Sequence, residues 1–251
     1  MAGKDILGAP ARAAALAVGL LLAVAPVALA QGGRDCRAPA WTSRYGSQRS
    51  SLHGCRARAG RREGHRRPRA SHVSAAKLAG SARAAAIATV LATPCQNTGL
   101  TPEAGDLPAL RAAVLCLVNR VRAENGRSPL APDARLEAAA EAHSREMVAL
   151  DYFQHISPSG QTPADRIKAA GYIPGLTYGY AVGENIAWGT LGLSTPEAIV
   201  RAWEASPEHL ANILEDQYRE TGIGVQAAVP QSLGEGEPGA IYTEDFGVIF
   251  R

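Results

Sequence analysis

The chain has 251 residues, 46% of them hydrophobic and 20% charged, and its formal net charge is +3. The length is enough for one domain with a sizeable core plus accessory segments. Residues 31–75 carry eleven Arg against two acidic residues, a net +9, whereas residues 76–251 carry thirteen Lys and Arg against twenty acidic residues, a net −7. Because the two parts carry opposite net charges, they cannot both attract the same kind of charged partner.

The first thirty residues have the composition of a secretory signal peptide. Lys4 and Arg12 lie in the basic beginning, an apolar stretch follows to about residue 27, and Ala-Leu-Ala at 28–30 fits a signal peptidase site. The apolar stretch is short for a membrane-spanning helix, and no other stretch is long and apolar enough to span a bilayer. We therefore predict a secreted, extracellular or cell-envelope protein without a transmembrane anchor.

Residues 31–94 form an Arg- and Ala-rich segment that we expect to be a disordered linker. Residues 31–75 have few hydrophobic side chains and no periodicity, so they cannot bury enough surface to fold. A basic tether for an anionic envelope is the alternative, and we expect no specific nucleic-acid binding. A second signal-like stretch at 75–94 leaves open a start of translation downstream of residue 70.

Four cysteines divide into two groups. Cys36 and Cys55 lie in the Arg-rich segment, whereas Cys95 and Cys116 lie at the beginning of the folded part. Export favours a Cys95–Cys116 disulfide, which would stabilise the fold by roughly 3 kcal/mol in the loop-entropy model. The chain has no C-x-x-C motif, so neither a thioredoxin-like site nor a thiolate zinc site is supported.

Helical periodicity predominates between residues 106 and 214. Asp106, Thr162 and Ser206 are residue types that begin helices, and Gly126 ends the first one. The predicted helices are 106–126, about 133–150, 162–171, 194–206 and 206–214. We expect loops at 155–163 and 172–183.

The end of the chain alternates apolar and polar residues as strands do. Residues 221–229 and 240–250 each have this pattern, and a Gly-, Pro- and Glu-rich loop joins them as a hairpin. Helices followed by an antiparallel hairpin predict an α+β fold in which the helices cover a sheet.

Three polar groups interrupt the apolar sequence: His155, Glu184 and the group Glu204, Glu208 and His209. Each is expected in a loop or at a helix end, where side chains from separate elements can converge. Glu184 lies in GENIAWG, where burial is costly unless another group pairs with it. Two histidines and a carboxylate would satisfy it by hydrogen bonds or through a divalent metal such as zinc. The alternative is that each residue is satisfied separately.

Five motifs in order resemble the bacterial branch of the CAP superfamily (cysteine-rich secretory proteins, antigen 5, pathogenesis-related 1), whose modules are also called SCP-like domains. They are LCLVNRVRAENG, YFQHISPSG, GENIAWG, AWEASPEHLANIL and YTEDFG, and the resemblance covers about Leu110 to Arg251. It implies a domain over 95–251 with a three-layer α-β-α sandwich around an antiparallel sheet. It also implies a groove with two His and two acidic residues, which in some members bind a divalent metal.

The resemblance assigns this groove to particular residues. His155, Glu184 and His209 match the family positions by motif. In many members an acid follows the helix-four tryptophan by about one turn, but here that position is Ser206, so Glu204 is the nearest substitute. The resemblance thus implies a metal site made by His155, Glu184, His209 and Glu204, with three ligands if Glu204 does not take part.

Four other polar residues have separate expectations. His143 lies on the apolar face of the second helix and is expected to be packed there. Asn185 is expected to bond the backbone and hold a loop. Glu244 and Asp245 are expected at a solvated strand end, with an approach to the groove as the alternative.

The resemblance and the residues leave three hypotheses for function. The first is a monomeric secreted module that binds a lipid, glycan or peptide at the envelope. The second is a hydrolase in which His155, Glu184 and His209 act as general base or activate a metal-bound water. The third is a structural network without a ligand. The chain has no H-E-x-x-H, G-x-S-x-G or P-loop motif, so no nucleophile is indicated.

Overall fold

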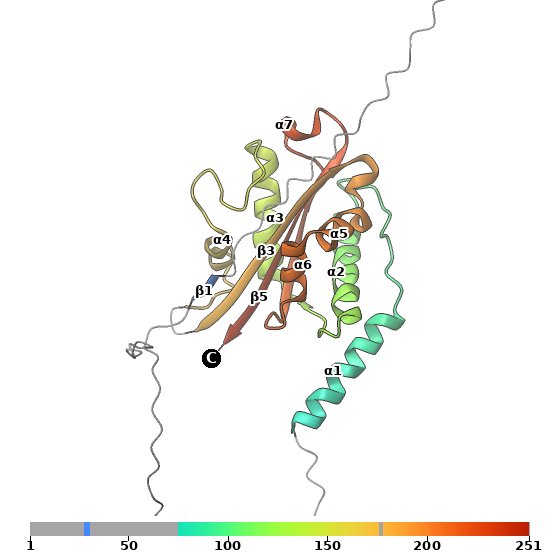
Figure 1. Cartoon of the computed structure of the whole chain (residues 1–251). Coiled ribbons are helices and arrows are strands. Elements are labelled where there is room, and N and C mark those ends of the chain that lie inside the picture. The colour runs from blue at the N-terminus through green and yellow to red at the C-terminus, as the bar shows by residue number, and fades with distance from the viewer. Residues whose placement is uncertain (1–27, 31–74, 176–177, 251) are drawn as a thin grey trace, which may run out of the picture.

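A mixed sheet runs through the centre of the structure, a computed structural model that describes residues 28–30, 75–175 and 178–250 (Figure 1). Its strands are β1 (Ala28–Ala30), β2 (Ala131–Pro132), β3 (Gly179–Thr190), β4 (Glu220–Gln226) and β5 (Gly239–Phe250). The strand order is β1-β3-β5-β4-β2, and every pairing is antiparallel except the short one between β2 and β4. The predicted C-terminal hairpin is therefore confirmed as β4 and β5.

Helices cover both faces of this sheet. They are α1 (Ala75–Ala92), α2 (Leu107–Glu124), α3 (Ala134–Ala149), α4 (Pro163–Ala169), α5 (Pro196–Ala205), α6 (Pro207–Leu214) and the short α7 (Gln231–Gly234), with a 3₁₀ turn η1 (Leu191–Ser194). Helices α3 and α4 lie on one face, called the α3 face, and α2, α5 and α6 on the other, called the α2 face (Figure 1). The predicted α+β, three-layer α-β-α architecture is confirmed.

Two predicted segments fall largely outside the described residues. The signal peptide prediction (1–30) is represented only by β1, which pairs with β3, and the linker prediction is represented only from residue 75. From there to Ala92 the chain is helical, as α1, rather than extended linker. Within the described ranges, no helix is both long and apolar enough to cross a membrane.

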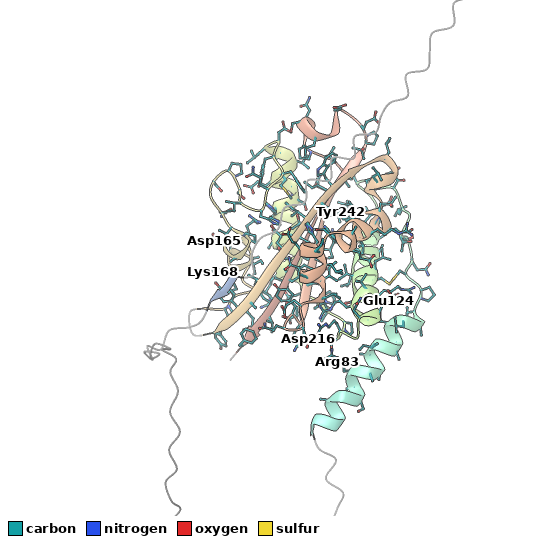
Figure 2. All side chains as sticks on the ribbon, in the orientation of Figure 1. Arg83, Glu124, Asp165, Lys168, Asp216 and Tyr242 are labelled. Carbon is teal, nitrogen blue, oxygen red and sulfur yellow. A yellow bond between two sulfur atoms is a disulfide. The ribbon has the colours of Figure 1, made fainter. Side chains whose placement is uncertain are left out.

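Helix α1 is attached to the domain by few polar contacts. Arg83 donates to the Gly126 carbonyl at 2.6 Å and pairs with Asp216 at 3.3 Å, and Figure 2 shows Arg83 and Asp216 at this junction. The chain then reaches Cys95, whose predicted disulfide to Cys116 of α2 is confirmed. The disulfide fixes the lead-in segment to the first helix of the domain.

The predicted helix starts are confirmed, but two of the predicted cap residues, Asp106 and Ser206, make no side-chain cap bond. Thr162 and Asp165 form a reciprocal capping box at the start of α4, and the Asp133 side chain accepts two backbone N–H groups at the start of α3. Asp106 occupies the cap position of α2 but makes no side-chain cap bond. Gly126 has φ +68°, a conformation that favours glycine, so it ends α2 as predicted.

Alternating glycines bring α3 into contact with β4. A Cβ on Gly222 would lie 2.0 Å from the Glu137 backbone nitrogen, and one on Gly224 would lie 2.2 Å from the Ala140 backbone. Both positions face α3, because residues two apart on a strand point to the same side. The pattern TGIGV therefore lets a helix backbone approach the sheet directly.

The GENIAWG segment is a strand, which corrects the prediction that Glu184 lies in a loop. The predicted loop 172–183 ends at residue 178, and β3 continues to Thr190 as a fully paired neighbour of β5. Glu184 and Asn185 lie opposite Asp245 and Glu244 in this register. A buried strand does not alternate in polarity, so its sequence lacked the usual strand pattern.

Arg122 organises the α2 face. Its guanidinium is fully buried and donates to the carbonyls of Ser128, Ile213 and Glu215, so it joins the end of α2 to the end of α6. Burial lowers its pKa to about 10, which still leaves it charged at neutral pH. Glu244 is its nearest buried acid, and burial raises the pKa of Glu244 to about 8 although Thr221 and Arg122 oppose the shift.

We expect Arg122→Met to lower the free energy of unfolding by about 2–4 kcal/mol, since one buried and two partly buried carbonyl groups lose their donor. Urea denaturation measures this change. Arg127→Met is the matched control, because Arg127 makes a half-exposed ion pair with Asp216, and such pairs contribute about 0–1 kcal/mol. Equal losses in the two variants would contradict an organising role for Arg122.

Candidate functional site

Strand β3 holds Glu184 at the centre of the α3 face. Its carboxylate is fully buried, and each oxygen has a different partner. His155, in the loop between α3 and α4, donates from Nδ1 to Oε1 at 2.6 Å. Arg166 of α4 donates from Nη2 to Oε2 at 2.7 Å and to the His155 carbonyl at 2.9 Å. The carboxylate therefore lies between an imidazole and a guanidinium.

These contacts control the charge on Glu184. Burial would raise its pKa, but the hydrogen bond from His155 and the positive charge of Arg166 together lower it. Glu184 is therefore ionised at neutral pH, and Arg166 supplies the permanent positive charge beside it.

His143 completes the floor of the site. The residue is fully buried on α3, with Nε2 3.1 Å from the Gln154 carbonyl and 3.9 Å from Glu184 Oε1. Burial lowers its pKa, so the ring is neutral at pH 7. The expectation of a packed, partner-satisfied histidine is confirmed, although its neighbour is the predicted site glutamate.

Asp245 faces Glu184 across the two strands. The expectation of a solvated strand end is wrong for both Glu244 and Asp245, because β5 is the central strand and both side chains are fully buried. Neither Asp245 oxygen has a hydrogen-bond partner among the described residues. Burial and the negative charge of Glu184 raise the pKa of Asp245 well above its ordinary value, so it is a neutral acid beside an anion. We call Glu184, His155, Arg166, His143 and Asp245 the Glu184 cluster.

A second group of residues adjoins the cluster and was missed in the sequence. Ser157 and Tyr152 donate to the same oxygen of Glu146, at 2.6 and 2.7 Å. Arg166 reaches Ser157 Oγ at 3.4 Å and so connects this group to the Glu184 cluster. The only available signal was the placement of His143 and Glu146 three residues apart on one helix. The loop conformation that brings Tyr152 and Ser157 back to them has no local pattern.

The structure places His209 and Glu204 away from the cluster. His209 is buried at the start of α6, on the α2 face, with Nδ1 2.8 Å from Ser206 Oγ. Glu204 lies on the exposed side of α5 beside Glu124, in a surface hollow between α2 and α5. Burial and Glu124 raise its pKa. Of the four predicted ligands, only His155 and Glu184 are in contact.

Asn185 ties α6 to the sheet, and its predicted bond to the backbone is confirmed. Its Nδ2 donates to the His209 carbonyl at 3.2 Å. Asn212 of α6 donates to the Glu184 carbonyl at 3.2 Å and to Asn185 Oδ1 at 2.9 Å. Neighbouring strand residues point to opposite faces of a sheet. Glu184 of the GEN motif therefore contacts the site on the α3 face, and Asn185 contacts α6 on the α2 face.

The donor set does not fit a divalent metal. In the part of the chain that the structure describes, no group of three or more His, Cys, Asp and Glu side chains is arranged to hold a metal ion. Both oxygens of Glu184 are already engaged, and one of them carries a guanidinium at 2.7 Å. A divalent cation would have to displace this positive charge or lie beside it, and both are electrostatically unfavourable.

We expect calorimetric titration of the full chain with zinc to give no binding that depends on His155 or His209. The comparison with His155→Ala and His209→Ala separates this site from histidines elsewhere in the chain. Arg166→Met, which removes the competing cation, is the variant in which zinc binding could arise. Binding near one equivalent that both alanine variants abolish would contradict the expectation and join the two histidines in one metal site.

The neutral state of Asp245 predicts a pH dependence of stability. In the unfolded chain Asp245 ionises above about pH 3.9, whereas in the folded chain it keeps its proton to a much higher pH. The folded state then binds the extra proton, so its stability falls as pH rises between the two pKa values, by at most about 1.4 kcal/mol per pH unit.

Asp245→Asn removes this term, so its stability relative to the wild type should increase between pH 5 and 8 in urea denaturation. The lowered pKa of Glu184 adds no slope in this range, since its contribution to stability is lost only as pH falls below its unfolded pKa of about 4.3. Parallel pH profiles for wild type and Asp245→Asn would show that Asp245 is ionised in the fold.

Comparison with known proteins agrees with the five motifs. A family model described as the cysteine-rich secretory protein family (CAP) matches residues 115–230. The uncharacterized protein YkwD of Bacillus subtilis (strain 168) is 34% identical over 155 residues, which are 62% of this chain and 53% of that protein. The chain thus spans about half the length of this curated relative.

Solved structures give weaker matches. An extracellular SCP-domain protein from Bacillus anthracis str. Ames is 25% identical, with a TM-score of 0.45, and the match covers 58% of this chain and 44% of that chain. An outer surface protein of Borrelia burgdorferi is 19% identical, with a TM-score of 0.43, and the match covers 53% of this chain and 88% of that chain. The likeness to the CAP superfamily rests instead on the family model, which matches residues 115–230, and on the sequence relative.

Proposed function

We propose that this chain is a secreted CAP-domain protein that acts by binding a ligand with an apolar part, a lipid, at the cell envelope. The binding surface is the loop that connects α3 to α4 above the Glu184 cluster. The observation that carries the proposal is the exposure of two large apolar side chains on this segment, Leu150 at 56% and Ile156 at 53%. Ile156 directly follows His155, so apolar surface lies beside the one cluster histidine at the edge of the buried site.

The charge balance of the cluster supports binding rather than hydrolysis. Glu184 is paired on both oxygens, so it is not poised to take a proton from a substrate or water. Arg166 also fixes the loop by donating to the His155 and Gln161 carbonyls. The cluster thereby supports a rigid loop whose apolar side chains remain exposed, and rigidity lowers the entropy cost of binding. A peptide or a glycan would use the polar side chains of the loop more than its apolar ones.

Hydrolysis of envelope polymers or peptides is the second candidate. The pairing of His155 Nδ1 with a buried carboxylate would orient an imidazole for proton transfer, and Ser157 Oγ donates to the Glu146 carboxylate at 2.6 Å. Activity that is lost in both Glu184→Gln and Ser157→Ala, with the fold retained, would favour this candidate over binding.

The test of binding uses vesicles of phosphatidylcholine, whose lack of net charge keeps the Arg-rich segment from dominating the result. We expect the full chain to sediment with the vesicles and the double variant Leu150→Ser with Ile156→Ser to lose most of this binding. The matched control is Leu191→Ser with Leu193→Ser, because these side chains are similarly exposed at η1. Equal sedimentation of both double variants would contradict a lipid site on the α3–α4 loop.

A further inference from the structure

The outer edge of β4 is left uncovered for most of its length. Strand β2 pairs with β4 only at Glu220 and Thr221, because Asp133 then begins α3. The Asp133 N–H donates to the Thr221 carbonyl, so the backbone of Thr221 faces outward, and by strand alternation so does that of Ile223. The segment of β4 without a strand neighbour at this edge, from Gly222 to Gln226, is about 16 Å long at the usual rise per strand residue.

The residues along this edge are buried, although no described strand lies beside them on the outer side. Ile223 is only 3% exposed, and the pairing of β2 with β4 ends at Thr221, two residues before it. Buried backbone groups are almost always paired, with water or a ligand where the protein supplies no partner. This edge therefore has outward backbone groups without a strand neighbour among the described residues, and an added strand pairs with such groups.

A hollow of about 300 Å³ lies along this edge, between helices from opposite faces of the sheet. It is lined by Arg111, Ala112 and Leu115 of α2, Pro132 of β2, Glu137 of α3 and Ile223 of β4. Its floor is strand backbone and its walls are mainly apolar. These are the features of a groove that accepts an extended chain by strand addition.

Charged side chains span the mouth of the hollow. Arg111 of α2 pairs with Glu137 and Glu141 of α3, across the strand edge. All three are partly exposed, and such pairs are worth about 0–1 kcal/mol, so a ligand could rearrange them at low cost. Two carboxylates against one guanidinium leave one excess negative charge at the mouth.

We propose that this groove, defined by the uncovered edge of β4 between α2 and α3, docks an extended peptide segment of another protein that carries a basic side chain. The peptide continues the sheet in line with β2 and pairs with the outward backbone groups of Ile223. Its basic side chain meets Glu137 and Glu141. The site lies beside Glu137 near the start of α3, whereas the α3–α4 loop follows the end of α3, so the two sites share no residue.

The probe is the capped peptide acetyl-Thr-Val-Lys-Val-Lys-Val-Thr-amide, titrated into the full ¹⁵N-labelled chain. We expect amide shifts centred on Ile223 and Ala112. A version of the peptide N-methylated at alternate residues has lost its donors and should not bind. Ala112→Trp should fill the groove and weaken binding by about tenfold or more. Ala149→Trp is the matched control, since Ala149 is an exposed alanine at the end of α3.

Three results would overturn the proposal. The first is no shift at Ile223 at millimolar peptide, and the second is peptide affinity that is the same in Ala112→Trp and wild type. The third is a dimer by light scattering that Ala112→Trp dissociates, which would mean that a second copy of the chain covers the edge. Phosphatidylcholine binding in Ala112→Trp should equal that of the wild type, so failure of this site and failure of the lipid site are distinguishable.

Discussion

Charge compensation on both sides of the central strand is the constraint on which the rest of the structure depends. Glu244 and Asp245 are consecutive, fully buried acids on β5, and they point to opposite faces. Each face contains one buried arginine: Arg122 on the α2 face and Arg166 on the α3 face. An uncompensated buried charge costs several kcal/mol, so each arginine needs its partners: backbone carbonyls for Arg122 and the Glu184 carboxylate for Arg166.

The two arginines solve this problem in different ways. Arg122 donates to three backbone carbonyls and reaches Glu244 only through space, so burial still raises the pKa of Glu244 against the opposing charge of Arg122. Arg166 contacts the Glu184 carboxylate directly and keeps it ionised, while Asp245 next to it holds a proton. The α2 face is therefore mainly a structural junction, whereas the α3 face concentrates charge next to a surface loop.

The two edges of the sheet differ in the groups that lie along their strands. On β3, Asn212 and the Trp203 indole N–H of the α2-face helices donate to the carbonyls of Glu184 and Ile186. On β4, β2 pairs with only the first two residues. Beyond them, the ion pair between Arg111 and Glu137 spans the edge. An edge that is satisfied by side chains is closed to an added strand, while one bridged by exposed charges remains accessible. This difference directs attention to β4 as an interaction surface.

The sequence by itself determined the helices α2 to α6, the C-terminal hairpin and the disulfide, but not the strand β3. These depend on local rules: Thr162 and Asp165 cap a helix through neighbouring backbone, and a Gly- and Pro-rich loop separates the two runs that form the hairpin. The pairing of His155 with Glu184 was also accessible, since the polar residues stood out in apolar surroundings. Their placement in a loop was wrong for Glu184, because a strand buried on both faces carries no alternation to detect.

Only the tertiary structure decided which residues share a face. Residues 184 and 185 are adjacent in sequence, but the pleat sends Glu184 toward His155 and Arg166 and sends Asn185 toward His209. Strand register and loop conformation bring Arg166, Asp245 and Glu146 to the site from positions tens of residues apart. No local sequence pattern predicts these long-range contacts. The physical reason is that burial and charge pairing are set by non-local contacts, whereas caps, turns and periodicity are set by neighbours along the chain.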